Sequence, residues 1–183
     1  MTRTPLEALD LLDFWWRAGP ARWFAKDEAF DAELKRRFGD LHAQASAGGC
    51  ESWRETAAGR LALILLLDQL SRNLNRGSPA AFANDAAARA LAAITLESGD
   101  DRAYPTEVRS FFYLPFMHSE DIADQERCVD LCRLNSPRDT YAYALEHLDI
   151  IRRFGRFPHR NAVLGRETTP AEAAYLESGG FSG

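Results

Sequence analysis

Apolar residues recur along the chain every three to four positions, which is the period of a helix buried along one face. A clear example is the stripe formed by Phe30, Leu34, Phe38 and Leu41. Runs that alternate between apolar and polar residues, as half-buried strands do, are missing from the sequence. The pattern therefore predicts an all-α protein.

Helix starts are marked by a hydroxyl residue, then proline, then an acid two positions later. Thr4-Pro5, Ser136-Pro137 and Thr169-Pro170 share this order, in which the hydroxyl caps the helix and proline occupies its first turn. Glycines mark the ends. Together these signals predict about eight helices, over residues 4–18, 27–47, 52–76, 79–98, 106–114, 119–134, 137–154 and 170–178.

The predicted helix over residues 52–76 contains the run Leu61–Leu67, which is apolar around the whole circumference. A helix of this kind is buried on all sides, so we expect it at the centre of the fold. No linker and no low-complexity segment interrupts the chain. At 183 residues the length suits one domain, and we predict a single all-helical domain over residues 1–183.

Charge and composition exclude several classes of function. The formal net charge of −5 does not suit a general nucleic-acid-binding protein, which needs a basic surface. The run Leu61–Leu67 is far shorter than a membrane span of about 20 residues. Cys50, Cys128 and Cys132 do not form a disulfide framework, and no apolar leader precedes the first helix. We therefore expect a cytoplasmic protein with reduced cysteines and no nucleic-acid or membrane partner.

Polar residues gather first where the buried run ends. Asp68 and Arg72 are four positions apart and can pair on one helix face, and Gln69 and Asn73 have the same spacing. Polar groups at the end of a buried helix need hydrogen-bond partners. One interpretation is therefore an internal network that holds helix ends together.

A second polar segment runs from Leu114 to Asp121. Pro115 is expected to end one helix, and Ser119 is expected to begin the next with Glu120 in its first turn. His118 precedes this start. Because histidine titrates close to neutral pH, His118 is interpreted either as a satisfied junction residue or as a titrating group.

The third segment lies near the C-terminus. His147 falls on the apolar face of the predicted helix 137–154, and no acid occurs between Ile150 and Arg166. That interval contains Arg152, Arg153, Arg156, Arg160 and Arg166, together with His159. The arginines can neutralise Asp68, Glu120 or Asp121 inside the fold. Alternatively, they can bind a carboxylate or phosphate through their two-pronged guanidinium groups.

Motifs for metals and cofactors are missing from the sequence. No two histidines have the local spacing of a metal site such as HxxxH. There is no phosphate-binding P-loop, no GxGxxG and no GxSxG nucleophile motif. We therefore expect neither a bound metal nor a cofactor.

The chain resembles the bacterial DUF924 family of uncharacterised proteins. The resemblance rests on blocks spread over the chain in order: Trp23-Phe24, Leu63–Gln69 with Arg72-Asn73, Phe82 with Asp85, Leu114–Asp121 with Gln125, and His147 with Phe154–Asn161 and Leu164–Arg166. It implies an all-α, tetratricopeptide-like fold of helices in antiparallel pairs. It implies no activity, because a fold alone does not define one.

The favoured functional hypothesis is a helical binding module for a small anionic molecule or an acidic peptide. Its predicted ligand-binding residues are Arg72, Asn73, His118, Arg153, Arg156, His159 and Arg160. An alternative is a hydrolase-like enzyme that uses His118 or His159 as general acid or base, oriented by Glu120 or Asp68. In a third interpretation these segments only stabilise the fold. Whether the protein is an enzyme, and which oligomer it forms, does not follow from the sequence.

Overall fold

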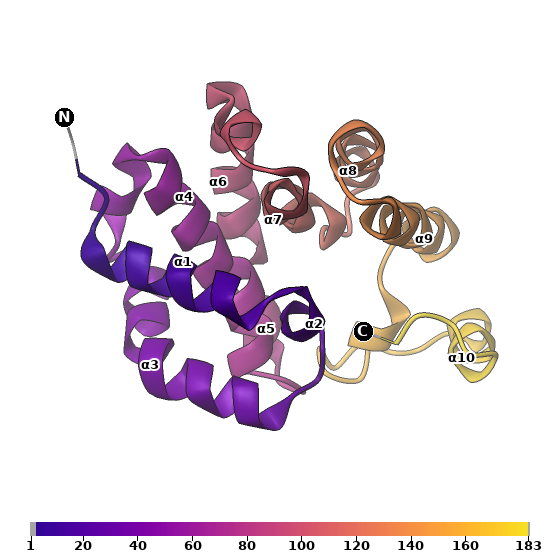
Figure 1. Cartoon of the computed structure of the whole chain (residues 1–183). Helices are drawn as coiled ribbons and strands as arrows, with labels where there is room; N and C mark the ends of the chain where they lie inside the picture. The colour runs from indigo at the N-terminus through magenta and orange to yellow at the C-terminus, as the bar shows by residue number, and fades with distance from the viewer. Residues whose placement is uncertain (1–2, 183) are drawn as a thin grey trace. The chain divides into compact units, whose positions relative to one another are not determined.

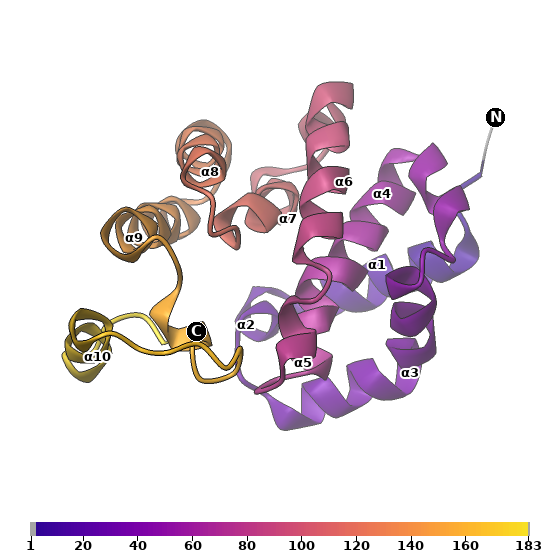
Figure 2. The ribbon, with the colours of Figure 1, turned by 180° about the vertical axis from the view of Figure 1, so that it is seen from behind.

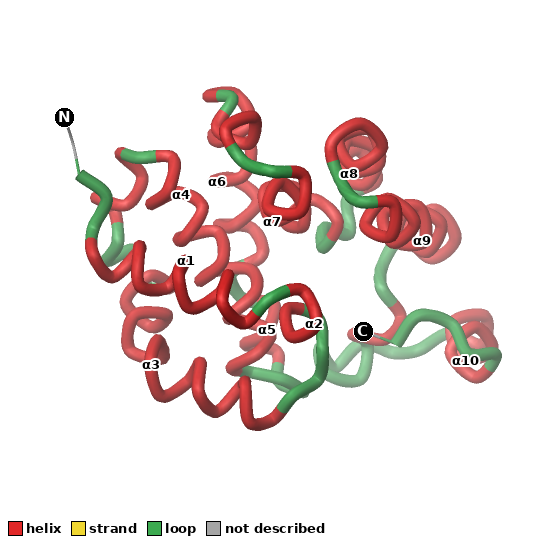
Figure 3. Tube along the Cα trace, viewed as in Figure 1, coloured by secondary structure: helices red, strands yellow, loops and turns green. Residues whose placement is uncertain are grey.

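The computed structural model describes residues 3–182 and contains only helices, turns and loops over that range (Figure 3). The all-α prediction is thus confirmed. The α-helices are α1 (Leu6–Ala18), α2 (Pro20–Trp23), α3 (Glu28–Ser46), α4 (Ala57–Ile64), α5 (Ser71–Leu74), α6 (Asp85–Ser98), α7 (Thr106–Met117), α8 (Ile122–Asn135), α9 (Arg138–Phe154) and α10 (Pro170–Glu177). The tetratricopeptide-like arrangement stays a prediction.

Shorter helical turns join these helices. The 3-10 turns are η1 (Glu51–Glu55), η3 (Pro79–Phe82), η4 (Asp100–Ala103) and η5 (Pro158–Arg160), and η2 (Leu65–Leu70) is a π-helical turn. The chain divides into two compact units, of which the first comprises Met1–Arg76 and Ala80–Tyr104 and the second Gly77–Pro79 and Pro105–Gly183.

In the first unit α4 packs against α1 and α6, and α3 packs against η2 and α5 (Figures 1 and 2). Trp15, Phe30 and Leu34 from α1 and α3 are buried together with Leu61 and Ile64 of α4. The run Leu61–Leu67 is buried throughout. Its predicted burial is therefore confirmed within the first unit.

The expected continuous helix 52–76 is wrong in detail, because the segment breaks into η1, α4, η2 and α5. Thr56 is extended and caps α4 by accepting a hydrogen bond from the N–H of Gly59 at 3.1 Å. A Cβ atom at Gly59 would collide with the carbonyl group of Trp53, so this turn requires glycine. Further along, the helix contains the π-helical turn η2 at Leu65–Leu70, in which backbone hydrogen bonds span five residues instead of four. Such π-helical turns occur often at functional sites.

In the second unit α8 packs against both α7 and α9. Contrary to the prediction, Pro115 does not end its helix, and α7 continues to Met117. Proline removes one backbone hydrogen bond inside a helix. Here the neighbouring Phe111, Phe112 and Phe116 are almost completely buried, and the free energy of burying them offsets the lost bond.

The helix after α7 also begins later than expected. Asp121, and not Ser119, is the N-cap of α8, since its side chain accepts from the N–H of Ala123 at 2.8 Å. The Ser119 hydroxyl instead accepts from the N–H of Asp121 and donates to Asp124. His118, Ser119 and Glu120 therefore form a short connection between α7 and α8.

The segment between α9 and α10 is the longest one without an α-helix, and only η5 interrupts it (Figure 3). It starts at Gly155, whose positive φ of 68° terminates α9. It ends at Thr169, which forms a complete capping box with Glu172. The capping signal at Thr169 is thus confirmed, whereas Pro5 and Pro137 take the N-cap positions of α1 and α9 without side-chain capping bonds.

No helix formed by residues 3–182 is long and apolar enough to cross a membrane.

Candidate functional site

The first unit contains a polar network around η2. Asp68 is completely buried, and its carboxylate accepts hydrogen bonds from Gln69 at 2.6 Å and from Arg72 at 3.2 Å. Arg72 also donates to Asp85 at the start of α6. The predicted pair of Asp68 and Arg72 is therefore confirmed.

Asp31 on α3 extends the same network. It accepts hydrogen bonds from Asn73 at 2.7 Å and from Arg76, so Asn73 contacts Asp31 and does not pair with Gln69 as expected. Asp31, Asp68 and Asp85 together offset the charges of Arg72 and Arg76. The acids thus outnumber the arginines, and the two residues predicted here as ligand-binding, Arg72 and Asn73, both bond carboxylates of their own unit.

His42, which was not among the residues predicted from the sequence, lies beside this network. Its Nε2 atom is 2.9 Å from the Ser71 hydroxyl, which donates to the Leu67 carbonyl. Burial lowers the pKa of His42. Asn84 also donates to Ser71, so hydroxyl and amide groups link α3, α5 and the start of α6.

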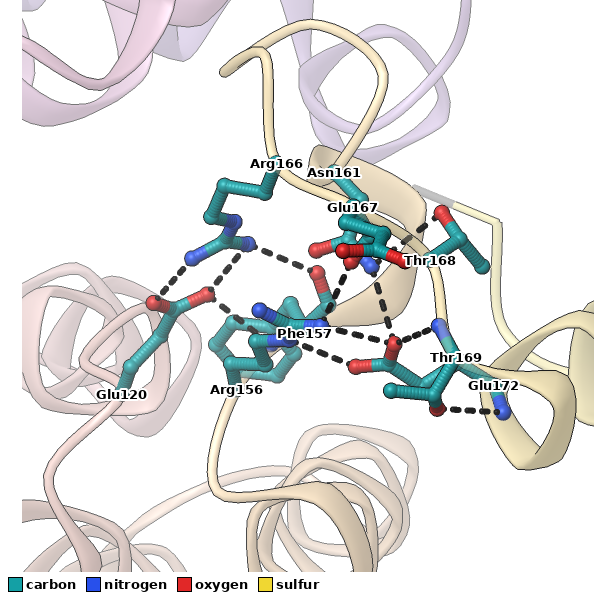
Figure 4. A network of polar contacts seen from close by, with 9 residues as sticks. All are labelled: Glu120, Arg156, Phe157, Asn161, Arg166, Glu167, Thr168, Thr169 and Glu172. Carbon is teal, nitrogen blue, oxygen red and sulfur yellow. Dashed lines mark hydrogen bonds and ion pairs between the residues drawn. The ribbon is translucent and has the colours of Figure 1, made fainter.

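In the second unit Glu120 links the connection between α7 and α8 to the segment between α9 and α10. Its two oxygens accept from Arg166 at 2.7 and 3.0 Å, and Oε1 also accepts from the N–H of Phe157 at 2.8 Å (Figure 4). Burial alone would raise the pKa of Glu120, but these hydrogen bonds outweigh it and the pKa lies below its ordinary value. The prediction that the arginine block neutralises an acid inside the fold is confirmed for Glu120.

A second carboxylate in this unit, Glu172, was not among the candidates. It is 2% exposed and accepts two hydrogen bonds from Arg156 at 2.6 and 2.8 Å. Asn161 and the N–H of Thr169 also donate to it (Figure 4). The hydrogen bonds from Arg156 are the main reason why the pKa of Glu172 falls to about 2. Arg156 therefore serves first as the partner of a buried acid.

The other arginines of the block differ in their surroundings. Arg153 is half exposed, pairs with Asp149 of its own helix and lies over the ring of Tyr175. Arg160 is buried, and its guanidinium group lies 4.4 Å from the centre of the Phe157 ring.

His147 is buried on α9, as its spacing predicted, and is 6% exposed. Its Nδ1 atom is 2.8 Å from the carbonyl oxygen of Tyr143, to which it donates, so that Nε2 keeps its lone pair. The ring contacts Phe157 and Phe181 edge to face. Burial lowers the pKa of His147 to about 3, and the neighbouring His118, Arg160 and His159 contribute to the lowering.

His159 follows Pro158 in η5, and its ring packs against Phe157 and Phe181. Burial lowers its pKa to about 4, and Arg160, His118 and Arg166 add to this effect, while Glu120 opposes it. Its Nδ1 atom is buried and has no hydrogen-bond partner among residues 3–182. We call the group formed by His118, His147, His159 and Arg160 the histidine site.

The histidine site joins three of the predicted ligand-binding residues, His118, His159 and Arg160, and adds His147. Arg153 and Arg156 lie in the same unit but pair with carboxylates. Residues 3–182 contain no group of three histidine, cysteine or acidic side chains placed to hold a metal ion. The site contains the imidazoles of His147 and His159, whose pKa values are lowered, and one buried guanidinium group, and such groups suit hydrogen bonding to an anion.

Comparison with known proteins places the chain among proteins without an assigned activity. The family model described as DUF924, bacterial protein of unknown function, matches residues 11–180. The solved structure of a protein of unknown function from Agrobacterium tumefaciens is 48% identical, with a TM-score of 0.90, and the match covers 93% of this chain and 97% of that one. The search of curated proteins found no match.

Proposed function

We propose, for a chain that belongs to the DUF924 family of bacterial proteins of unknown function, that its second unit is a cytoplasmic binding module. The ligand is a small anion that carries a carboxylate or phosphate group, and the histidine site receives it. A cytoplasmic location agrees with three cysteines that are all unpaired and buried.

The observation that carries this proposal is the buried Nδ1 atom of His159, which has no hydrogen-bond partner among residues 3–182. Arg160, His118 and Arg166 all lower its pKa, and only Glu120 acts in the opposite direction. Glu120 is already engaged by Arg166 and the backbone of Phe157. An anion that enters the site would therefore meet the Nδ1 atom of His159 beside the guanidinium group of Arg160.

Binding of an anion should also change the protonation of the site. A negative charge next to an imidazole favours its protonated form and raises its pKa. The buried Nδ1 of His159 and the Nε2 of His147 are the atoms that would gain or share a proton. We therefore expect ligand binding to take up protons and to tighten as the pH falls from 7 to 5.

The enzyme alternative has less support. A histidine with a pKa near 4, as His159 has, is a weak base at neutral pH. Asp68, proposed to orient such a base, is buried in the first unit and bonded by Gln69 and Arg72. Glu120 has both oxygens occupied. His42 and Ser71 are in hydrogen-bond contact, but the Ser71 hydroxyl is completely buried and donates to the Leu67 carbonyl, so it is not presented to a substrate. The binding module is therefore the better proposal.

The test is calorimetric titration of the full chain with inorganic phosphate and with succinate, at pH 5 and pH 7, in two buffers of different ionisation enthalpy. The expected result is binding that is tighter at pH 5 and accompanied by proton uptake. His159→Gln should weaken it by about tenfold, the usual loss when a hydrogen bond to a charged group is removed.

Two controls make this result specific. Arg152→Gln removes an exposed arginine that pairs with Glu126 outside the histidine site, and it should leave the affinity unchanged. His42→Gln is the second control, because it removes a histidine that belongs to the first unit and not to the histidine site. If neither anion binds at millimolar concentration, or if His159→Gln and Arg152→Gln behave alike, the binding proposal is wrong.

A further inference from the structure

The first unit contains an open cavity of about 620 Å³, and none of the site residues predicted from the sequence lines it. It lies between the start of α1, the second half of α3 and residues 49–53. Small-molecule sites in proteins usually measure about 300–1,000 Å³. The cavity is thus large enough for a small organic molecule.

The floor and the rim of this cavity differ in chemistry. The cavity is lined in part by almost completely buried residues, Phe38, Trp53 and Cys50 (exposed fractions 2%, 4% and 6%), which we call its floor. The more accessible Leu6 and Leu41 also line it, so part of the lining is apolar. The Cys50 thiol forms neither a disulfide nor a hydrogen bond within residues 3–182. The cavity is also lined by three exposed acids, Glu7, Asp10 and Asp40, which we call its rim.

Arg37, the basic residue among those that line the cavity, does not neutralise the whole rim. Its guanidinium group bonds both oxygens of Asp10 and lies over the rings of Phe14 and Phe38. Glu7 and Asp40 form no ion pair with any described residue. The negative charge of Glu7 also acts on Cys50. Burial is the main reason why the pKa of Cys50 is raised, and the charge of Glu7 adds to this effect.

From this arrangement we propose that the cavity binds a small organic cation, namely a primary amine that carries an apolar chain. The ammonium group would donate hydrogen bonds to the carboxylates of Glu7 and Asp40. The apolar chain would lie on the exposed Leu6 and on Leu41, which also line the cavity. The proposal is independent of the histidine site, which belongs to the other unit.

Three probes of equal chain length test this proposal on the full protein: hexylammonium, hexanol and hexanoate. Titration is followed by calorimetry and by the rate at which a neutral alkylating agent modifies Cys50. Hexylammonium should bind at least tenfold more tightly than hexanol, hexanoate should not bind, and bound hexylammonium should slow the modification of Cys50. Salt should weaken binding of the cation and not of the alcohol.

A matched pair of double variants isolates the rim carboxylates. Glu7→Gln with Asp40→Asn removes two negative charges at the cavity, and we expect it to weaken hexylammonium binding by about fivefold. Asp13→Asn with Glu33→Gln removes two charges from the same helices, but from residues that pair with Arg17 and Arg36 outside the cavity. This control should bind as the unchanged protein does.

Two outcomes overturn the proposal. If hexanol binds as tightly as hexylammonium, the cavity recognises an apolar chain and the acidic rim has no role. If both double variants weaken binding equally, the effect comes from the net charge of the protein and not from Glu7 and Asp40. Thermal unfolding of each variant shows whether it is folded.

Discussion

Each unit of the protein contains a network of acids and arginines, but the two networks are built differently. In the first unit the carboxylates of Asp31, Asp68 and Asp85 sit on helices or at their ends and share Arg72 and Arg76. In the second unit the arginine partners of Glu120 and Glu172 come from the non-helical stretch that follows α9 (Figure 4).

This difference has a chemical consequence. In the first unit three acids surround two arginines, so no positive charge is left over. In the second, Glu120 and Glu172 are matched by Arg166 and Arg156, while Arg160 and the histidines remain beside them. The first network can explain how helix ends are held, whereas the second lies next to the histidine site. An arginine-rich segment can thus stabilise a fold and also border a candidate ligand site.

The largest effect should come from Glu172→Ala. The substitution leaves the guanidinium group of Arg156 without its carboxylate and also removes the acceptor for Asn161 and for the N–H of Thr169. Breaking a buried ion pair on one side is strongly destabilising, and we expect the melting temperature to fall by about 10 °C. Thermal unfolding followed by circular dichroism measures this change.

Glu126→Ala is the matched control, because it removes another glutamate of this unit that pairs with an arginine, in this case Arg152 of α9. That pair is exposed on both sides, with exposed fractions of 58% for Arg152 and 56% for Glu126. An exposed pair contributes little, so we expect a shift of at most about 2 °C. Equal shifts for Glu172→Ala and Glu126→Ala would show that the network of the second unit does not hold α10.

The second prediction concerns stability against pH. His147 and His159 have folded-state pKa values of about 3 and about 4, below the ordinary 6.5. As the pH falls, the unfolded chain therefore takes up protons before the folded one does, and stability present above pH 6.5 is lost toward pH 4. The slope of the unfolding free energy against pH is set by the number of protons taken up on unfolding. His159→Gln should lower that number by about one, which reduces the slope by about 1.4 kcal/mol per pH unit.

Denaturant unfolding at half-unit pH steps measures that dependence. Glu172 acts in a different window, because its pKa of about 2 means that its contribution is lost as the pH falls from about 4.5 to 2. Glu172→Gln should thus change the curve only below pH 4.5. An unchanged slope between pH 6.5 and 4 in His159→Gln would show that this histidine is not held neutral by the fold.

A smaller effect is expected at Phe181, whose ring covers both imidazoles with centroid distances of 4.5 Å to His147 and 5.2 Å to His159. Phe181→Ala admits water to both rings, and burial is the main cause of their lowered pKa values. We expect the pKa of His159 to rise by about one unit. Titration of the ring protons by NMR measures this, and an unchanged pKa would assign the lowering to the neighbouring cations alone.

How much of this follows from the sequence depends on how far apart the interacting residues are. The capping box at Thr169, the pair of Asp68 and Arg72, and the buried face of His147 involve spacings of three, four or seven residues along one helix. Helix geometry alone defines such contacts, so they could be predicted. For the same reason the all-α class was clear from the pattern.

Partners far apart in sequence were harder to identify. Arg156 bonds Glu172 across 16 positions and Arg166 bonds Glu120 across 46. Glu172 looked like an ordinary capping acid, because nothing in the local pattern shows that it is buried. The predicted helix end at Pro115 was wrong for the opposite reason. The local preference of proline to end a helix is outweighed by the burial of the phenylalanines around it. Both cases depend on tertiary packing, which a local pattern does not contain.

The smallest effect should come from Arg76→Ala, which tests the network of the first unit. Arg76 is 37% exposed, so solvent screens its pair with Asp31. Asp31 also keeps Asn73 as a donor when Arg76 is removed. We expect a loss of about 1 kcal/mol or less, measured as the free energy of unfolding in denaturant, with Arg36→Ala, which breaks an exposed pair on α3, as the control. A loss as large as that of Glu172→Ala would mean that Asn73 cannot hold Asp31, and the contrast between a shared network and a paired one would fail.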